Sequence, residues 1–208
     1  MRKKTDEKRM SIMDATYELF RTKGLKNTSM AEIKARAGCG KATLYNYFSS
    51  KEDLFVQCML ERDEVFMEDI FSSFQDPRLE LAAQLQDFGV NIMRKMTLPD
   101  ILASRRLMIA ESERKDVGDM IAKRTQARVQ MLVSFLQRAM NEGKLRSDDS
   151  LIAAKYLYAL LEAEVLSPVL TLTRKKITNR FINHAVTRVV SAFLMIYTPQ
   201  KKRSNRPR

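Results

Sequence analysis

The sequence predicts an all-α protein of about nine helices, in which three short N-terminal helices precede a larger helical domain. The 208 residues include 6 Gly, 5 Pro, 13 Met and no Trp, a mixture that favours helices over the tight turns of an all-β chain. No segment shows the period-two alternation of a half-buried strand. Apolar residues instead recur at helical spacing, between plausible helix starts and stops.

Local start and stop signals divide the chain into these helices. Gly24 suits the left-handed position after the first helix, and Ser29 with Glu32 forms a capping box at the start of the second. Gly38 and Gly40 permit a sharp turn before the third helix. The predicted helices cover residues 8–23, 29–37, 41–48, 51–74, 77–96, 100–114, 116–141, 150–166 and 176–197.

The net charge of +12 lies mostly at the two ends of the chain. Residues 1–50 hold eleven Lys and Arg against five Asp and Glu, and residues 199–208 hold five basic residues and no acidic one. The middle of the chain is nearly neutral. A basic unit followed by a neutral body suggests a polyanion-binding unit on a separate domain, whereas the tail is expected to be a solvated, disordered segment.

The composition also excludes several classes of protein. Cys39 and Cys58 form no CxxC pair and His184 has no acidic or thiol neighbour at ligand spacing, so neither a zinc site nor a disulfide scaffold is expected. The N-terminus has no apolar stretch of a secretory signal, and the longest uncharged apolar run is too short to span a bilayer. We expect a reduced cytosolic protein without membrane contact or cofactor.

The second and third helices, joined by a glycine turn, fit a helix-turn-helix. Leu44 and Phe48, four residues apart, are expected to face the core. The other faces of the third helix then carry groups suited to DNA: Lys for phosphate or guanine, Asn for adenine, and hydroxyls for phosphate. Ser29 and Lys51 stand at helix starts, which favour anions. These residues can equally be caps and solvated surface groups, and spacing alone does not decide between the two.

An ordered run of residues resembles the N-terminal domain of TetR-type transcriptional regulators. It extends from Ile12 to Leu54 and includes the stretch Thr28-Ser29-Met30-Ala31-Glu32-Ile33 and the residues from Ala37 to Phe48. The resemblance implies a DNA-binding domain over residues 1–54 and an effector-binding and dimerisation domain over 55–198. The charge distribution adds a basic tail over 199–208. The residues at positions where the family contacts DNA are Ser29, Lys41, Thr43, Tyr45, Tyr47 and Lys51, with Asn46 as a further base reader.

Two apolar stripes on the last helix suggest two contacts, one with its own core and one with a second subunit. The resemblance implies a homodimer built on the last two helices, whereas a pair of helices buried within one monomer would explain the stripes equally well. The residues expected at the dimer interface are Leu157, Leu161, Val186, Val190, Phe193 and Tyr197.

The body of the chain is expected to hold an effector pocket, because the family encloses one there and flexible Met side chains suit an adaptable apolar cavity. Ordinary core packing explains any single one of these residues. Glu111, Glu162 and Glu164 could meet a cationic ligand, or pair with Arg105, Arg106 or Arg188. The candidate pocket residues are Met67, Phe71, Phe88, Met108, Glu111, Met131, Phe135, Tyr158 and Glu162.

These features predict a homodimeric repressor that an unknown small-molecule effector releases from a palindromic DNA operator. The alternative is a DNA-associated architectural or protein-interaction module without an effector. An enzyme is not expected, because the sequence shows no Ser/His/Asp ordering, no metal-ligand spacing and no glycine-rich phosphate loop.

Overall fold

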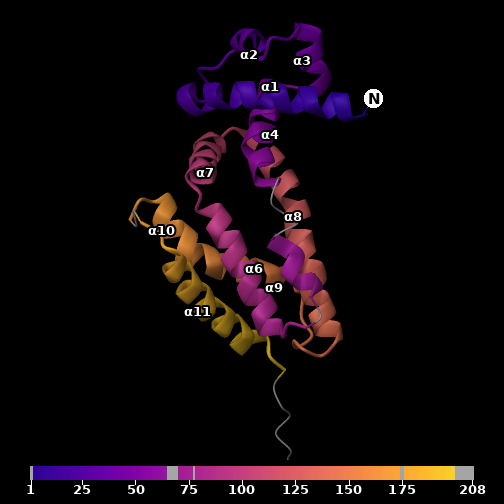
Figure 1. Cartoon of the computed structure of the whole chain (residues 1–208), viewed down its shortest axis with the longest axis vertical. Coiled ribbons are helices and arrows are strands. Elements are labelled where there is room, and N and C mark those ends of the chain that lie inside the picture. The colour runs from indigo at the N-terminus through magenta and orange to yellow at the C-terminus, as the bar shows by residue number, and fades with distance from the viewer. Residues whose placement is uncertain (1, 65–69, 77, 174–175, 200–208) are drawn as a thin grey trace, which may run out of the picture. The chain divides into compact units, whose positions relative to one another are not determined.

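The computed structural model describes residues 2–64, 70–76, 78–173 and 176–199, and every regular element in these ranges is helical (Figure 1). This confirms the predicted all-α class. In chain order the elements are α1 (Arg2–Lys23), α2 (Met30–Ala37), α3 (Lys41–Tyr47), α4 (Lys51–Glu64), the 3-10 turn η1 (Ser72–Gln75), α6 (Leu81–Met96), α7 (Pro99–Glu111), α8 (Lys115–Asn141), α9 (Ser150–Leu161), the π-helical segment η2 (Glu162–Leu166), α10 (Ser167–Leu170) and α11 (Asn179–Tyr197).

The chain forms two compact units. Unit 1 consists of Met1–Met67 and Leu98–Thr125, and unit 2 consists of Glu68–Thr97 and Gln126–Arg208. The division into these units does not fall at the expected boundary, residue 54. The reason is that residues 98–125, from the middle of the sequence, pack with the N-terminal helices. The assignment of separate roles to residues 1–54 and 55–198 stays a prediction.

Unit 1 is built around α1, which packs against α2, α4 and α7. Phe20 of α1 and Phe55 of α4 are fully buried and meet edge to face, with ring centroids 5.2 Å apart. Met108 of α7 and Val117 of α8 belong to the same core cluster. The buried Tyr17 hydroxyl lies 3.2 Å from Ser104 Oγ of α7. The mid-chain segment is therefore part of the core beneath the first four helices.

The local stop signals are confirmed at the helix ends. Gly24, Gly38 and Gly143 have φ values of 74°, 56° and 70°, the left-handed conformation that glycine adopts without a steric penalty. Ser29 and Glu32 form the predicted capping box at the start of α2. The first helix begins earlier than predicted, at Arg2.

The eighth predicted helix differs from expectation at its end. It was expected to finish near Leu166, with Pro168 beyond it, but the chain continues through η2 into α10, which contains Pro168. Proline has no N–H and its ring crowds the preceding turn. The helix widens into a π-helical turn before Pro168, where the Ser167 N–H donates to the Glu162 carbonyl five residues earlier. A π-helical turn thus lets the helix pass a proline that would otherwise end it.

Unit 2 has α6, α9 and α11 at its centre, with α11 packed against both α6 and α9. Four Phe rings and one Tyr ring form a connected cluster within it. Phe74 and Phe135 stack with centroids 3.7 Å apart and planes 8° apart, and Phe88 contacts Phe71, Phe74 and Tyr158.

Gly89 in α6 marks a close approach to α11. A Cβ atom at this position would lie 2.5 Å from Val186 Cγ1. We therefore expect Gly89→Ala to lower the free energy of unfolding by about 1–3 kcal/mol through overpacking, although the same change in an exposed helix would raise it by about 1 kcal/mol. Urea unfolding followed by circular dichroism measures the effect.

The double variant Gly89→Ala/Val186→Ala provides the control, because removing the two Val186 methyl groups opens room for the new one. The double variant should lose less stability than the sum of the two single variants. Additive losses would show that the approach of the two helices is not the cause.

Candidate nucleic-acid interface

Helix α3 buries two apolar side chains on one face and exposes polar side chains on the others. Leu44 and Phe48 are 1% and 0% exposed and belong to the core cluster of unit 1. Lys41, Tyr45 and Asn46 are exposed on the remaining faces, and the Lys41 Nζ atom lies 6.0 Å from the centre of the Tyr45 ring. The apolar pair therefore fixes which side chains of α3 face outward.

Thr43 and Tyr47 are half-buried. Tyr47 packs against the core cluster, and its ring centroid lies 6.3 Å from that of Phe48. Both residues keep part of their surface accessible. The structure thus brings five of the seven predicted DNA-binding residues together on this one helix.

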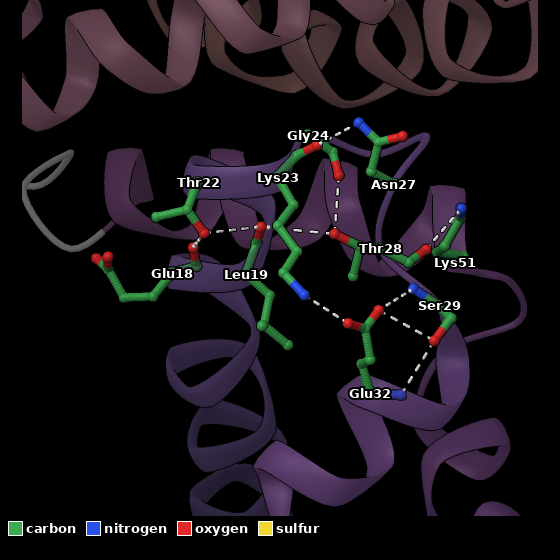
Figure 2. A network of polar contacts seen from close by, with 10 residues as sticks. All are labelled: Glu18, Leu19, Thr22, Lys23, Gly24, Asn27, Thr28, Ser29, Glu32 and Lys51. Carbon is green, nitrogen blue, oxygen red and sulfur yellow. Dashed lines mark hydrogen bonds and ion pairs between the residues drawn. The ribbon is translucent and has the colours of Figure 1, made fainter.

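The start of α2 is tied to the end of α1 by a polar network (Figure 2). The Glu32 N–H donates to Ser29 Oγ at 3.2 Å, and the Ser29 N–H donates to Glu32 Oε2 at 2.9 Å. The Lys23 ammonium donates to the other carboxylate oxygen of Glu32. These hydrogen bonds, led by that from Lys23, lower the pKa of Glu32 to about 2. Ser29 is therefore a cap, and its exposed position also leaves it accessible to a phosphate.

Lys51 is hydrogen-bonded to the turn that joins α1 to α2. Its Nζ atom donates to the carbonyl oxygens of Leu25 and Thr28, at 2.7 and 2.9 Å, and the residue is half-buried. Figure 2 shows its ammonium beside the turn that joins α1 to α2. The turn thus offers two backbone acceptors next to the start of α4, and the expected contact of Lys51 with a DNA phosphate stays a prediction.

An open groove lies between the starts of α2 and α4, with Tyr45 of α3 on its wall. Lys26 and Asn27 line it and are exposed, and the Asn27 side chain donates to the Lys23 carbonyl at 3.1 Å. Sequence reasoning missed these two residues, since a lysine in a loop carries no periodic signal. The groove places a cation and two helix starts around one surface, which suits a polyanion.

The candidate pocket residues are divided between the two units. Phe71, Phe88, Phe135 and Tyr158 meet in the aromatic cluster of unit 2, together with Phe74, which the sequence reasoning missed. Met108 and Glu111 belong to unit 1, where Met108 is part of the core cluster. Met131 is 45% exposed and Glu162 is exposed as well. Met67 lies outside the described residues.

Of the two roles considered for Glu164, contact with a cationic ligand or an ion pair with an arginine, the structure shows the ion pair. The Arg188 guanidinium of α11 donates to both carboxylate oxygens of Glu164. This pairing lowers the pKa of Glu164, against burial, which acts to raise it. The carboxylate therefore has its partner within unit 2, in agreement with the predicted pairing with Arg188.

The predicted dimer-interface residues need correction. All six, Leu157, Leu161, Val186, Val190, Phe193 and Tyr197, are buried inside the protomer, so none can present a side chain to a second subunit. Of the two apolar stripes on α11, the one that contains Val186, Val190, Phe193 and Tyr197 faces the protomer's own core. The large apolar side chains that α9 and α11 expose are instead Leu151, Ile152, Tyr156, Met195 and Ile196.

Within the described ranges, no group of three or more His, Cys, Asp or Glu side chains could hold a metal ion. No helix in the part of the chain that the structure describes is long and apolar enough to cross a membrane. Cys39 is half-buried against the core cluster of unit 1, and Cys58 is buried.

Comparison with known proteins gives matches over both parts of the chain. Residues 12–58 match the family described as bacterial regulatory proteins, tetR family. Residues 83–199, more than half of the chain, match the C-terminal domain of AefR-like transcriptional repressors. A fatty acid metabolism regulator protein of Bacillus subtilis is 33% identical over 61 residues, which is 29% of this chain and 31% of the relative's length.

Solved structures match over most of the chain. A TetR family transcriptional regulator from Pseudomonas syringae is 28% identical with a TM-score of 0.70, and the match covers 94% of this chain and 99% of the other. The flavonoid-responsive regulator FrrA is 27% identical with a TM-score of 0.76, covering 94% of this chain and all of the other.

The network at the start of α2 predicts a specific titration. Because hydrogen bonds hold the folded pKa of Glu32 near 2, below its ordinary value of 4.5, the stabilisation they give is complete above pH 4.5 and is lost as the pH falls toward 2. In a carbon-13 NMR titration of the glutamate carboxyl groups, Glu32 should stay ionised at pH 3.

Lys23→Met removes the largest cause of the shift and should raise the pKa of Glu32, while the two contacts with Ser29 keep it below 4.5. A wild-type Glu32 that titrates with the exposed glutamates would contradict the network.

Proposed function

The chain belongs to the TetR family of bacterial transcriptional regulators, and we propose that it is a homodimeric repressor which a small-molecule effector releases from a palindromic DNA operator. TetR-family regulators are DNA-binding transcription factors without enzymatic activity. A repressor is favoured because the matched C-terminal domain is that of transcriptional repressors.

The observation that carries this proposal is the surface of α3. Two buried side chains fix its inner face, and Lys41, Tyr45 and Asn46 remain on the outer faces. In the proposed complex Asn46 reads an adenine edge, while Lys41 and Tyr45 contact phosphates. The groove at the starts of α2 and α4, with Ser29 and Lys26, accepts a further phosphate.

The proposed dimer uses the exposed apolar side chains of α9 and α11. These two helices pack together within unit 2, and they carry Ile152, Tyr156, Met195 and Ile196 on their exposed surface. Exposed apolar groups gathered on neighbouring helices are typical of an interface with a second copy. A twofold axis then spaces the two α3 helices by roughly one DNA turn, about 34 Å.

The effector is proposed to bind in unit 2, where the aromatic cluster lies. Flat rings such as the stacked Phe74 and Phe135 suit a planar aromatic compound, and the relative FrrA is described as flavonoid-responsive. Such a compound shifts DNA binding only if it binds the operator-competent and the released arrangement with different affinity.

DNA binding through Lys41 has a measurable salt signature. The logarithm of the association constant with operator DNA should fall linearly with the logarithm of the salt concentration. Lys41→Met removes one phosphate contact from each subunit, so the slope should become shallower by roughly 2 for the dimer. Fluorescence anisotropy at several salt concentrations, with an operator selected from random sequences, measures the slope.

Lys176→Met is the matched control, because it removes an exposed lysine from unit 2. Its slope should equal that of the wild type. Equal slopes for all three proteins would contradict phosphate contact by Lys41, and equal affinity for all DNA sequences would favour an architectural module.

The dimer surface is tested at Met195, which is 81% exposed and therefore tolerates a polar residue in the folded protomer. Met195→Glu would bury two like charges at the twofold interface, which costs several kcal/mol, so the dissociation constant should rise by about 100-fold. Sedimentation velocity measures the dissociation. Leu172→Glu, at another exposed apolar residue outside α9 and α11, should leave the dimer intact; dissociation of both variants would overturn the assignment.

A further inference from the structure

We propose that Gln57 of α4 is a positioning residue of the DNA interface, which holds the Asp53 carboxylate against the loop between α3 and α4. The inference rests on the proposed binding of DNA by α3 and the adjoining groove. Gln57 is only 7% exposed and does not line that groove, so it acts through the residues that it contacts.

The amide of Gln57 lies between a donor and an acceptor. Arg9 of α1 donates to Gln57 Oε1, from Nη2 at 2.7 Å and from Nε at 3.3 Å. Gln57 Nε2 donates to Asp53 Oδ1 at 2.7 Å. Because a guanidinium offers only donors and a carboxylate only acceptors, the amide fits between them in a single orientation. Because the amide is buried, the loss of either partner leaves a polar group that water does not readily satisfy.

The other carboxylate oxygen of Asp53 holds the loop that follows α3. Asp53 Oδ2 accepts from the Ser49 N–H at 3.0 Å and from the Ser49 hydroxyl at 3.1 Å. The Asp53 N–H in turn donates to Ser50 Oγ at 3.0 Å. Ser49 directly follows Phe48, the buried residue at the end of α3. The carboxylate therefore fixes the path of the chain from α3 to α4.

This loop belongs to the proposed DNA surface. Ser49 and Ser50 line the groove between the starts of α2 and α4. Tyr47, a predicted DNA contact, stands two residues before Ser49. Since the position of the loop depends on the Asp53 carboxylate, and the carboxylate is oriented by the Gln57 amide, a change at Gln57 should reach the groove without touching DNA.

Gln57→Glu tests this chain of contacts, because it keeps an acceptor for Arg9 and replaces the donor to Asp53 by a second carboxylate. At pH 8 the two carboxylates repel each other, so operator affinity should fall by about 10-fold relative to the wild type. At pH 5 a proton shared by the pair restores the hydrogen bond, since a neighbouring like charge raises the pKa of a carboxyl group. The variant should then bind within about 2-fold of the wild type. Fluorescence anisotropy with the selected operator measures both ratios.

Gln84→Glu is the matched control, because Gln84 is a glutamine of similar burial, 8% exposed, in unit 2. Its operator affinity relative to the wild type should be the same at pH 8 and at pH 5. A loss that depends on pH in both variants would show a general effect of a buried carboxylate. Such a result, or a Gln57→Glu affinity ratio that does not change with pH, would overturn the proposal.

The double variant Gln57→Glu/Asp53→Asn reverses the hydrogen bond and leaves the net charge unchanged. The new asparagine donates to the new glutamate, which still accepts from Arg9, and the asparagine oxygen still accepts from the Ser49 N–H. This variant should bind the operator as the wild type does at both pH values, even if Gln57→Glu alone does not fold. Binding no tighter than that of Gln57→Glu at pH 8 would contradict the positioning role.

Amide hydrogen exchange at Ser49, measured at pH 7 without DNA, separates this proposal from the proposed function. The Ser49 N–H should exchange faster in Gln57→Glu than in the wild type, and at the wild-type rate in the double variant. If the wild type binds no operator, the proposed function fails, and the exchange rate still shows whether Gln57 holds the loop. Equal rates in Gln57→Glu and the wild type would overturn the proposal.

Discussion

The candidate nucleic-acid interface depends on the burial of Leu44 and Phe48 beneath α3. A helix of seven residues is not stable by itself in water, since nucleating a helix costs more than so few hydrogen bonds return. The two buried side chains supply the missing stabilisation and set the rotation of the helix about its axis. The outward position of Lys41, Tyr45 and Asn46 is therefore a consequence of core packing. It does not depend on contacts made by these three side chains themselves.

Local signals made much of the fold and part of the site predictable from the sequence. The capping box of Ser29 and Glu32 and the left-handed Gly38 act within a few residues, so their outcome does not depend on the rest of the chain. The same holds for Leu44 and Phe48, whose four-residue spacing already separates the inner from the outer face of α3. These features place the helix-turn-helix to within a residue or two.

Contacts between distant residues account for what the sequence left open. The two stripes of α11 are both apolar, and only the packing of α6 and α9 decides that Val186 and Phe193 face inward. The partners of Lys51 are backbone carbonyls, which have no residue type to recognise in a sequence. The π-helical turn before Pro168 is likewise not visible in the sequence, since a proline is ordinarily typical of a helix end.

Met108 and Val117 belong to the core of unit 1, and this limits which segments of the chain can be exchanged by recombination. A recombination event that transplanted residues 1–54 alone would leave Tyr17 without Ser104 and the core without its two mid-chain members. A viable chimaera would have to inherit residues 98–125 from the same parent. The first four helices and this mid-chain segment therefore form one unit of inheritance, because neither completes the core without the other.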